Sequence, residues 1–356
     1  MTREELVKLV KGGDMVHEMD ISQTDCSGAD LSGGIFNDSK LNAASFTGAN
    51  LKEASFIGCE IQGSDFRKAV FTEVSFINCD LSGAVFAESN LAEVNFVSCC
   101  LNRANFSKAN LSEANFTETS LQQADLSDAD LTTANFINAD FTNTKLSGAN
   151  LDRSCLIEAE LEGVDLQNAR IEQCVFQTPK LNGQNFAGMN LSKTQFRDAE
   201  MRDCDFRNSN LVQTSFMGAD LQNCIFDNAD ASLAIFYGSK LNRASFRNTR
   251  LEQASMNECD LTDAKLIGTN LTMAQMGDAI CERTEFSGSD LTYADLSHAN
   301  LGNADLSNTS LFRTRLHETI DSGAVWDGST KNLALGQDAK RLKAEQWKPK
   351  PRNGEI

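Results

Sequence analysis

The residues of this chain best suited to chemistry are its eleven cysteines, which are spread over 356 residues. Cys59, Cys79 and Cys99 are spaced twenty residues apart, and thiols at regular intervals can form disulfides, bind a metal or fill a core. Seven of the cysteines share one position of a five-residue pattern, a position of small residues that we expect to point inward. We therefore predict reduced, core-filling thiols, with Cys100 and Cys155 as the more accessible and more reactive ones.

The other reactive residue types do not form a recognisable catalytic set. His298 and His317 are expected to lie near each other, but the sequence offers no further metal ligand beside them. It also contains no Ser-His-Asp arrangement, no glycine-rich phosphate loop and no Cys-x-x-Cys pair. We therefore predict no catalytic residue, no bound metal and no cofactor, and we expect that the protein is not an enzyme.

These residues are carried by an unbroken five-residue repeat, whose sixty central positions run from residue 21 to residue 316. All but three of these centres are Leu, Ile, Phe or Met, and the residue two before each centre is almost always small. A period of five fits neither an α-helix nor a long strand. Two apolar positions that flank one polar position, followed by two more polar residues, indicate a short strand and then a corner.

Four such sides close a coil of twenty residues, and a second period supports this geometry. Of 22 Phe, 21 occupy centres, and 19 of those lie at positions ending in 6, whereas Leu dominates the centres ending in 1. This phase places Phe on two opposite walls and Leu on the other two. The sequence therefore predicts an all-β fold, a parallel β-solenoid of about fifteen coils that is ~70 Å long.

Segments such as ANLSEANF (109–116) and ADLSDADL (124–131) resemble the A(D/N)LXX motif of the pentapeptide-repeat family. The resemblance covers about 84% of the chain and implies a right-handed quadrilateral parallel β-helix. We divide the chain into three parts on this basis. They are a capping helix in 1–18, the repeats in 19–320, and a C-terminal cap with a basic tail in 321–356.

The charge of the chain is strongly asymmetric. The formal net charge is -18, composed of +4 in residues 331–356 and -22 in the rest. An acidic rod repels phosphate, so we expect no direct binding of nucleic acid. No apolar run reaches the length of a membrane span, and the first residues lack the core of a signal peptide. We therefore expect a cytoplasmic protein without a membrane contact.

Residues twenty apart lie above one another in such a coil, so outward positions form columns along the rod. One column, with a flanking residue, is unexpectedly apolar, and its members are Ile35, Ile57, Ile77, Val97, Ile137, Ile157, Met217 and Tyr237. One explanation is the preference of β-branched residues for a ladder. The other is a contact face for a protein partner or a second copy of the chain.

A second column contains four like charges, Glu53, Glu73, Glu93 and Glu113. Carboxylates one strand spacing apart repel each other unless a positive group meets them. They are either solvated on a wet face or form a docking stripe for a basic partner, such as the basic tail of another copy.

Three consecutive small positions near the middle of the rod are replaced by Pro179, Gln184 and Met189. Proline cannot donate a ladder hydrogen bond. We expect a bulge or kink at this coil, which would then be a joint between two half-rods.

The regular walls and the apolar column favour a non-enzymatic scaffold or adaptor that binds protein partners, with homo-oligomers formed through an outer face or the C-terminal tail. The family resemblance implies two alternatives. One is a DNA mimic that binds a type II topoisomerase, as in quinolone resistance. The other is an accessory of type VI secretion that helps to load effectors.

Overall fold

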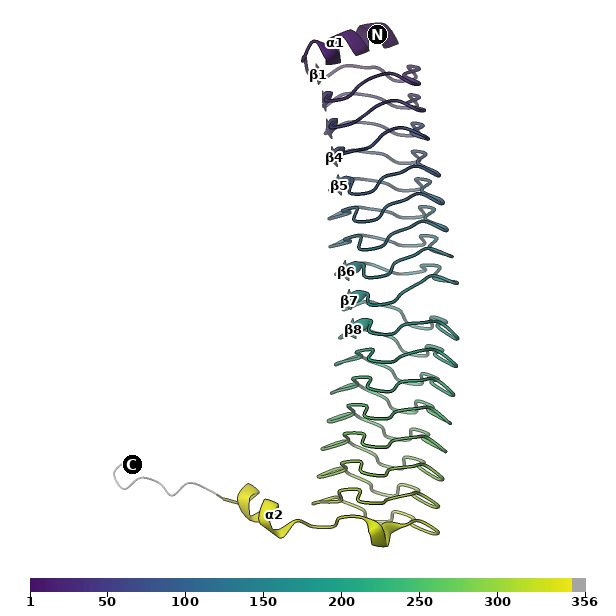
Figure 1. The fold of residues 1–356 in the computed structure, drawn as a ribbon, viewed down its shortest axis with the longest axis vertical. Helices are drawn as coiled ribbons and strands as arrows, with labels where there is room; N and C mark the ends of the chain where they lie inside the picture. The colour runs from purple at the N-terminus through teal and green to yellow at the C-terminus, as the bar shows by residue number, and fades with distance from the viewer. Residues whose placement is uncertain (348–356) are drawn as a thin grey trace, which may run out of the picture.

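Each coil of the chain contains twenty residues, because residues i and i+20 pair in parallel from Val16↔Phe36 to Arg315↔Leu335. The computed structural model describes residues 1–347, and the coils stack into one long rod (Figure 1). The predicted class, a parallel β-solenoid built from five-residue units, is confirmed.

Regular secondary structure is sparse and short within residues 1–347. The elements are α1 (Arg3–Lys11), β1 (Val16–His17), β2 (Ile35–Asn37), β3 (Ser55–Ile57), β4 (Ser75–Ile77), β5 (Asn95–Val97), β6 (Cys155–Ile157), β7 (Val175–Gln177), β8 (Gln195–Arg197), a 3-10 helix (Lys331–Leu333) and α2 (Ala339–Glu345). Strands β1–β5 form one parallel sheet and β6–β8 another. Elsewhere single bridges join neighbouring coils, so regular strands occupy fewer coils than the fifteen predicted.

Four stacks of bridges give the rod four faces, which we number from the first centre on each. Face 1 begins at Ile21, face 2 at Cys26, face 3 at Leu31 and face 4 at Phe36, and each continues at intervals of twenty residues. All eight strands found in residues 1–347 lie on face 4. This face is therefore the most regular side of the rod.

The core is filled by two ladders of phenylalanine rings, on faces 2 and 4. Phe36 and Phe56 stack on face 4 with ring centroids 4.6 Å apart, and rings on face 2 stack at similar distances. The ladders meet edge to face, as Phe86 and Phe96 do at 79°. Such packing is favourable beyond simple burial, and it accounts for the phase of the Phe repeat.

The residue two after each centre turns the corner in the left-handed region. Every fifth position from Gly13 to Gly328 has positive φ, which makes 64 positions in the described chain. Only 17 of them are Gly. Asn and Asp occupy many of the others, as the sequence predicts, but Leu233, Met273 and Tyr293 are forced into the same conformation.

The two ends of the rod differ. Helix α1 begins with a capping box between Thr2 and Glu5 and buries Leu6 and Val10 on the first coil, which closes that end. Helix α2 lies beside the last coils and not across the end (Figure 1). The last part of the basic tail, the predicted oligomer contact, falls in 348–356 and lies outside the described residues. No helix within residues 1–347 is both long and apolar enough to span a bilayer.

Candidate functional site: the outer columns of the rod

The predicted apolar column lies on face 4. Ile57 and Ile77 are ladder partners, as are Ile77 and Val97. Within the predicted set, Ile57 and Met217 are exposed by 36% and 37% and Tyr237 by 40%, whereas Val97 and the remaining isoleucines of the column are half-buried by their neighbours. The structure therefore places these residues in one column of face 4, with Thr117 between Val97 and Ile137 and with Ile35 on the adjacent outward position.

Strand preference accounts for only part of this column. Ile57, Ile77 and Val97 end strands β3, β4 and β5, where β-branched residues are favoured. Ile137 and Met217, like Tyr237, lie in turns, for which no such preference exists. Strand preference therefore does not explain why these outward positions are apolar.

The column is divided by two polar residues. Ile157 is followed by Gln177 and Arg197, the last residues of β7 and β8, before apolar residues resume at Met217. We call residues 57–157 of the column the upper patch and residues 217–237 the lower patch. The sequence already contained this division, but the structure shows that both patches share one flat face.

The glutamate column lies on face 3, at the positive-φ corners. All four side chains are exposed, and Glu53 pairs with Lys52 at 3.1 Å. The ladder that would space them evenly is interrupted, because no bridge joins residues 70 and 90 in the described chain. A surface cleft of about 520 Å³ separates Glu73 from Glu93 there.

Phe71 lies at this interruption, which we call the Phe71 opening (between 69–73 and 89–93). Every other centre on face 3 is aliphatic. The Phe71 ring packs against both Phe66 and Phe86, tilted by 53° and 54°, while those two rings stack directly on each other 4.9 Å apart. The sequence analysis missed this feature. A usable signal existed, since Phe71 is one of two core phenylalanines outside the positions ending in 6.

Pro179, Gln184 and Met189 lie beside a larger gap in the ladder, which we call the mid-rod opening (between 159–172 and 179–192). At this level of the described chain no bridge joins residues 160 and 180, 165 and 185, or 170 and 190. Pro179 is buried, whereas Gln184 and Met189 are half-buried. The predicted kink residues therefore coincide with a local loss of pairing on faces 1, 2 and 3.

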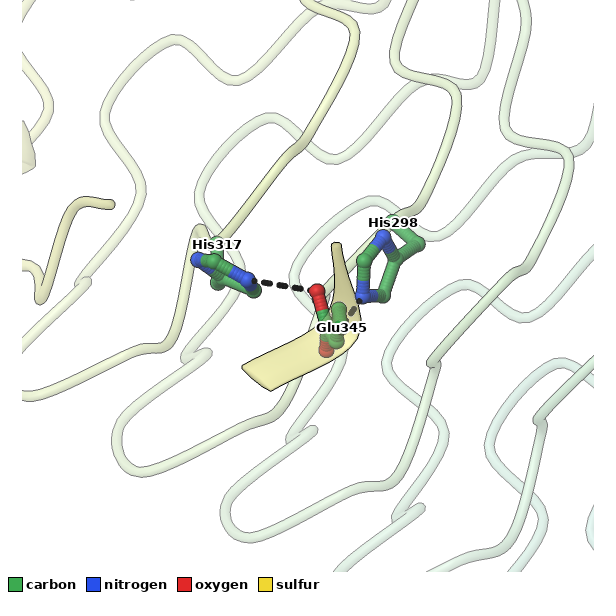
Figure 2. Close-up of side chains that lie close together, drawn as sticks. All are labelled: His298, His317 and Glu345. Atoms are coloured by element: carbon green, nitrogen blue, oxygen red, sulfur yellow. Dashed lines mark hydrogen bonds and ion pairs between the residues drawn. The ribbon is translucent and has the colours of Figure 1, made fainter. Parts of the chain in front are cut away.

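The two histidines are brought together by a residue that the sequence analysis did not connect with them. Glu345 of α2 lies between the imidazoles, 3.1 Å from Nε2 of His317 and 3.3 Å from Nε2 of His298 (Figure 2). Bonds from His317 and then from Arg341 lower the pKa of Glu345 to about 2. Glu345 lies far from the repeats in sequence and belongs to no repeat pattern, so periodicity could not reveal it.

The donors and acceptors of this cluster favour an attachment of α2 over a metal site. Nδ1 of His317 accepts the backbone N–H of Asp338 at 3.0 Å, so the neutral ring carries its proton on Nε2 and donates it to Glu345. A metal would need that Nε2 lone pair. Arg341 also donates to Glu345 at 2.7 Å, and its charge opposes a cation.

The cysteines show no arrangement for catalysis. All eleven are free, and buried thiols such as Cys174 donate to the carbonyl of the preceding coil, here Leu151 at 2.8 Å. Cys100 and Cys155 are half-buried, and burial raises the pKa of Cys155, which lowers its thiolate fraction. Every buried side-chain nitrogen or oxygen in residues 1–347 has a hydrogen-bond partner.

Family models identify the repeat. A model for the pentapeptide repeat region matches residues 69–136, 129–203 and 199–276, and a model of eight pentapeptide repeats matches 35–72, 274–308 and 289–320. The chain belongs to the pentapeptide-repeat family. No curated protein matches it.

Solved structures of the same kind are similar to this chain. QnrB1, a plasmid-mediated fluoroquinolone resistance protein, is 19% identical over 58% of this chain and 96% of its own, with a TM-score of 0.23. HetL from Nostoc, involved in heterocyst differentiation regulation, is 18% identical over 95% and 98%, with a TM-score of 0.21. A pentapeptide-repeat protein of the Arabidopsis thaliana thylakoid lumen is 25% identical over 34% and 66%, with a TM-score of 0.21.

Proposed function

We propose that this pentapeptide-repeat protein is a non-enzymatic scaffold that binds a protein partner along face 4. The observation that carries the proposal is the apolar column, and above all its members in turns, Ile137, Met217 and Tyr237. Apolar residues that gather in one outward column of a regular face are typical of an interaction surface. The absence of a buried unpaired polar group in residues 1–347 gives no support to a hidden substrate site.

The test replaces three residues of the upper patch, as Ile57→Lys, Ile77→Lys and Ile137→Lys together. We expect binding of the partner, or self-association where the partner is a second copy, to weaken about tenfold or more. Sedimentation equilibrium measures self-association. Binding of a different protein is measured by affinity capture from a lysate of the native host and then by titration with the purified partner.

A matched control exists on the other faces. Val70, Ile225 and Ile280 are apolar residues on faces 3, 2 and 1 that are at least as exposed as Ile57, Ile77 and Ile137. Their triple replacement by Lys adds the same charge and should leave binding intact. Equal binding by both triple variants and the parent chain would exclude face 4 as the contact.

The DNA-mimic alternative has weaker support from the surface. Many Asp residues before the centres are engaged in the coil itself, as Asp25 and Asp140 are when they accept the N–H two residues on. Others pair with Arg, including Asp65 with Arg67. Part of the negative charge is therefore already engaged within the rod. A gyrase supercoiling assay decides this alternative, since a DNA mimic would inhibit the reaction. No feature of residues 1–347 supports the alternative role in type VI secretion.

A further inference from the structure

The mid-rod opening affects only three sides of the rod. Faces 1, 2 and 3 lose their bridges at this level, whereas the coils on either side keep them, for example Asp140↔Glu160 and Lys180↔Glu200. Face 4 continues without a break, because β6 pairs with β7 and β7 with β8. In Figure 1 the coils stay evenly spaced beside these strands and separate on the opposite side.

The missing N–H of Pro179 is not the reason for the opening, which corrects the sequence argument. The equivalent residues, two before a centre on face 1, do not use their N–H in the ladder. Cys79 makes no backbone hydrogen bond through its N–H within the described chain, and Ala219 donates to Phe216 of its own coil at 3.0 Å. Pro179 therefore removes no ladder bond. Pro179, Gln184 and Met189 are all larger than the small residues that occupy this position in other coils. Such overpacking displaces the backbone.

The side chain of Gln184 bridges the opening. In a regular coil the carbonyl two before a centre accepts from the next coil, as Ala44 accepts from the N–H of Asp65 at 3.0 Å. At the opening, Val164 accepts instead from the Gln184 side chain at 3.2 Å. A cleft of about 270 Å³ lies between the separated coils, lined by Gly163 and Asn182 among others.

We propose that the mid-rod opening is a one-sided hinge, with β6, β7 and β8 as its intact edge. Bending there breaks few backbone hydrogen bonds, because faces 1 and 2 have lost theirs and face 3 keeps only the bond from Gln173 to Ser192 at 3.0 Å. Bending at a regular coil would break several such bonds. The hinge line crosses face 4 at Gln177, between the upper and lower patches. Its motion would set the angle that the two patches present to a partner.

Distances between the half-rods test the hinge directly. Lys108, Asn208 and Asn308 lie at the same position of face 2, opposite face 4, and successive members are five coils apart. Spin labels on noncanonical amino acids at 108 and 208 span the opening, whereas labels at 208 and 308 do not. We expect the distance distribution of the first pair to be about twofold broader than that of the second. Equal widths would overturn the hinge.

A second measurement guards against label artefacts. The amides of Leu161, Leu166 and Ile171 face the opening, and we expect them to exchange about tenfold or more faster than those of Phe141, Leu146 and Leu151 one coil earlier. The variant Pro179→Ala, Gln184→Ala and Met189→Ala should restore slow exchange and narrow the first distribution. Slow exchange at these three amides in the parent chain would refute the opening, irrespective of how the variant folds and of whether face 4 binds a partner.

Discussion

At the scale of single residues, the corner position dominates the local conformation of the coil. A non-glycine residue in the left-handed region is destabilised by about 1–2 kcal/mol, and 47 of the 64 corners are not glycine. The corner is retained because its own N–H and the carbonyl of the next residue enter the ladder, as the N–H of Ala43 does with Gln62 and the carbonyl of Ala44 does with Asp65. Individual corners therefore offer room for stabilisation without any change of fold.

Leu233 is the clearest such corner. Its φ is 62° and its side chain is 41% exposed, so little burial depends on it. We expect Leu233→Asn to stabilise the rod and Leu233→Val to destabilise it, each by about 1 kcal/mol, because Asn tolerates positive φ and a β-branched residue does not. Thermal unfolding of the two variants checks this, and Val at least as stable as Asn would contradict it.

Glu345 controls the attachment of α2. Its pKa is lowered from 4.5 to about 2 in the folded chain, mainly by His317. A lowered pKa stabilises the attached state above 4.5, and this stabilisation is lost as the pH falls from 4.5 through 2. We expect α2 to stay attached at pH 7 and pH 5 and to detach below 4.5, as followed by amide exchange at Leu342.

The variant Glu345→Gln provides the control, because an amide does not titrate in this range. Its α2 should be weakly attached at every pH, with no transition below 4.5. A transition of the same size in the variant would show that other groups control the attachment. His298, His317 and Arg341 are the charged or titratable residues that contact Glu345, and they are the next to replace.

At the scale of elements, the loss of pairing on face 3 coincides with a single core ring, that of Phe71. Phe71 and Phe141 are both core phenylalanines outside the main ladders, yet the N–H of Phe141 donates to Glu160 at 2.8 Å, whereas that of Phe71 makes no bond to the next coil in the described chain. On face 3 the Phe71 ring packs against Phe66 and Phe86 at 6.0 and 5.9 Å. Face 1 accommodates Phe141 beside Phe136.

Both Phe→Leu substitutions lose buried apolar surface, but only the one at residue 71 can restore hydrogen bonds between coils. Comparing them therefore separates the two effects. We expect Phe71→Leu to close the Phe71 opening and slow the exchange of the amides at 71, 73 and 90. It should be less destabilising than Phe141→Leu by about 1–3 kcal/mol, because each restored hydrogen bond contributes roughly 1 kcal/mol. Equal losses of stability, with unchanged exchange at residue 71, would show that the ring does not hold the coils apart.

The five-residue period predicted most of the elements, because a buried centre and a small neighbour fix which side chains enter the core. It could not predict which sides become true strands, since Ile57 in β3 and Ile137 in a turn carry the same residue type. It also could not place α2, whose position depends on polar contacts to His298 and His317 from outside the repeat. Three bulky residues in sequence did indicate the mid-rod opening, although for a reason that the structure corrects.

At the scale of the whole molecule, face 4 differs from the other three faces. It carries the strands, the uninterrupted ladder, both apolar patches and the docked α2. Helix α2 contacts Ser297 through Arg341, at the same outward position as Ile57 and Tyr237 further along the rod. The chain thus already uses this column to hold one of its own segments.

The twenty-residue coil also constrains how the gene for such a rod can change in length. Loss of one five-residue unit keeps the core pattern, but it rotates everything downstream by one face, so Met217 and Tyr237 would no longer align with Ile57. Loss of four units preserves the alignment and only shortens the rod. Length variants that keep face 4 intact should therefore differ by multiples of twenty codons, a rule set by geometry rather than by folding stability.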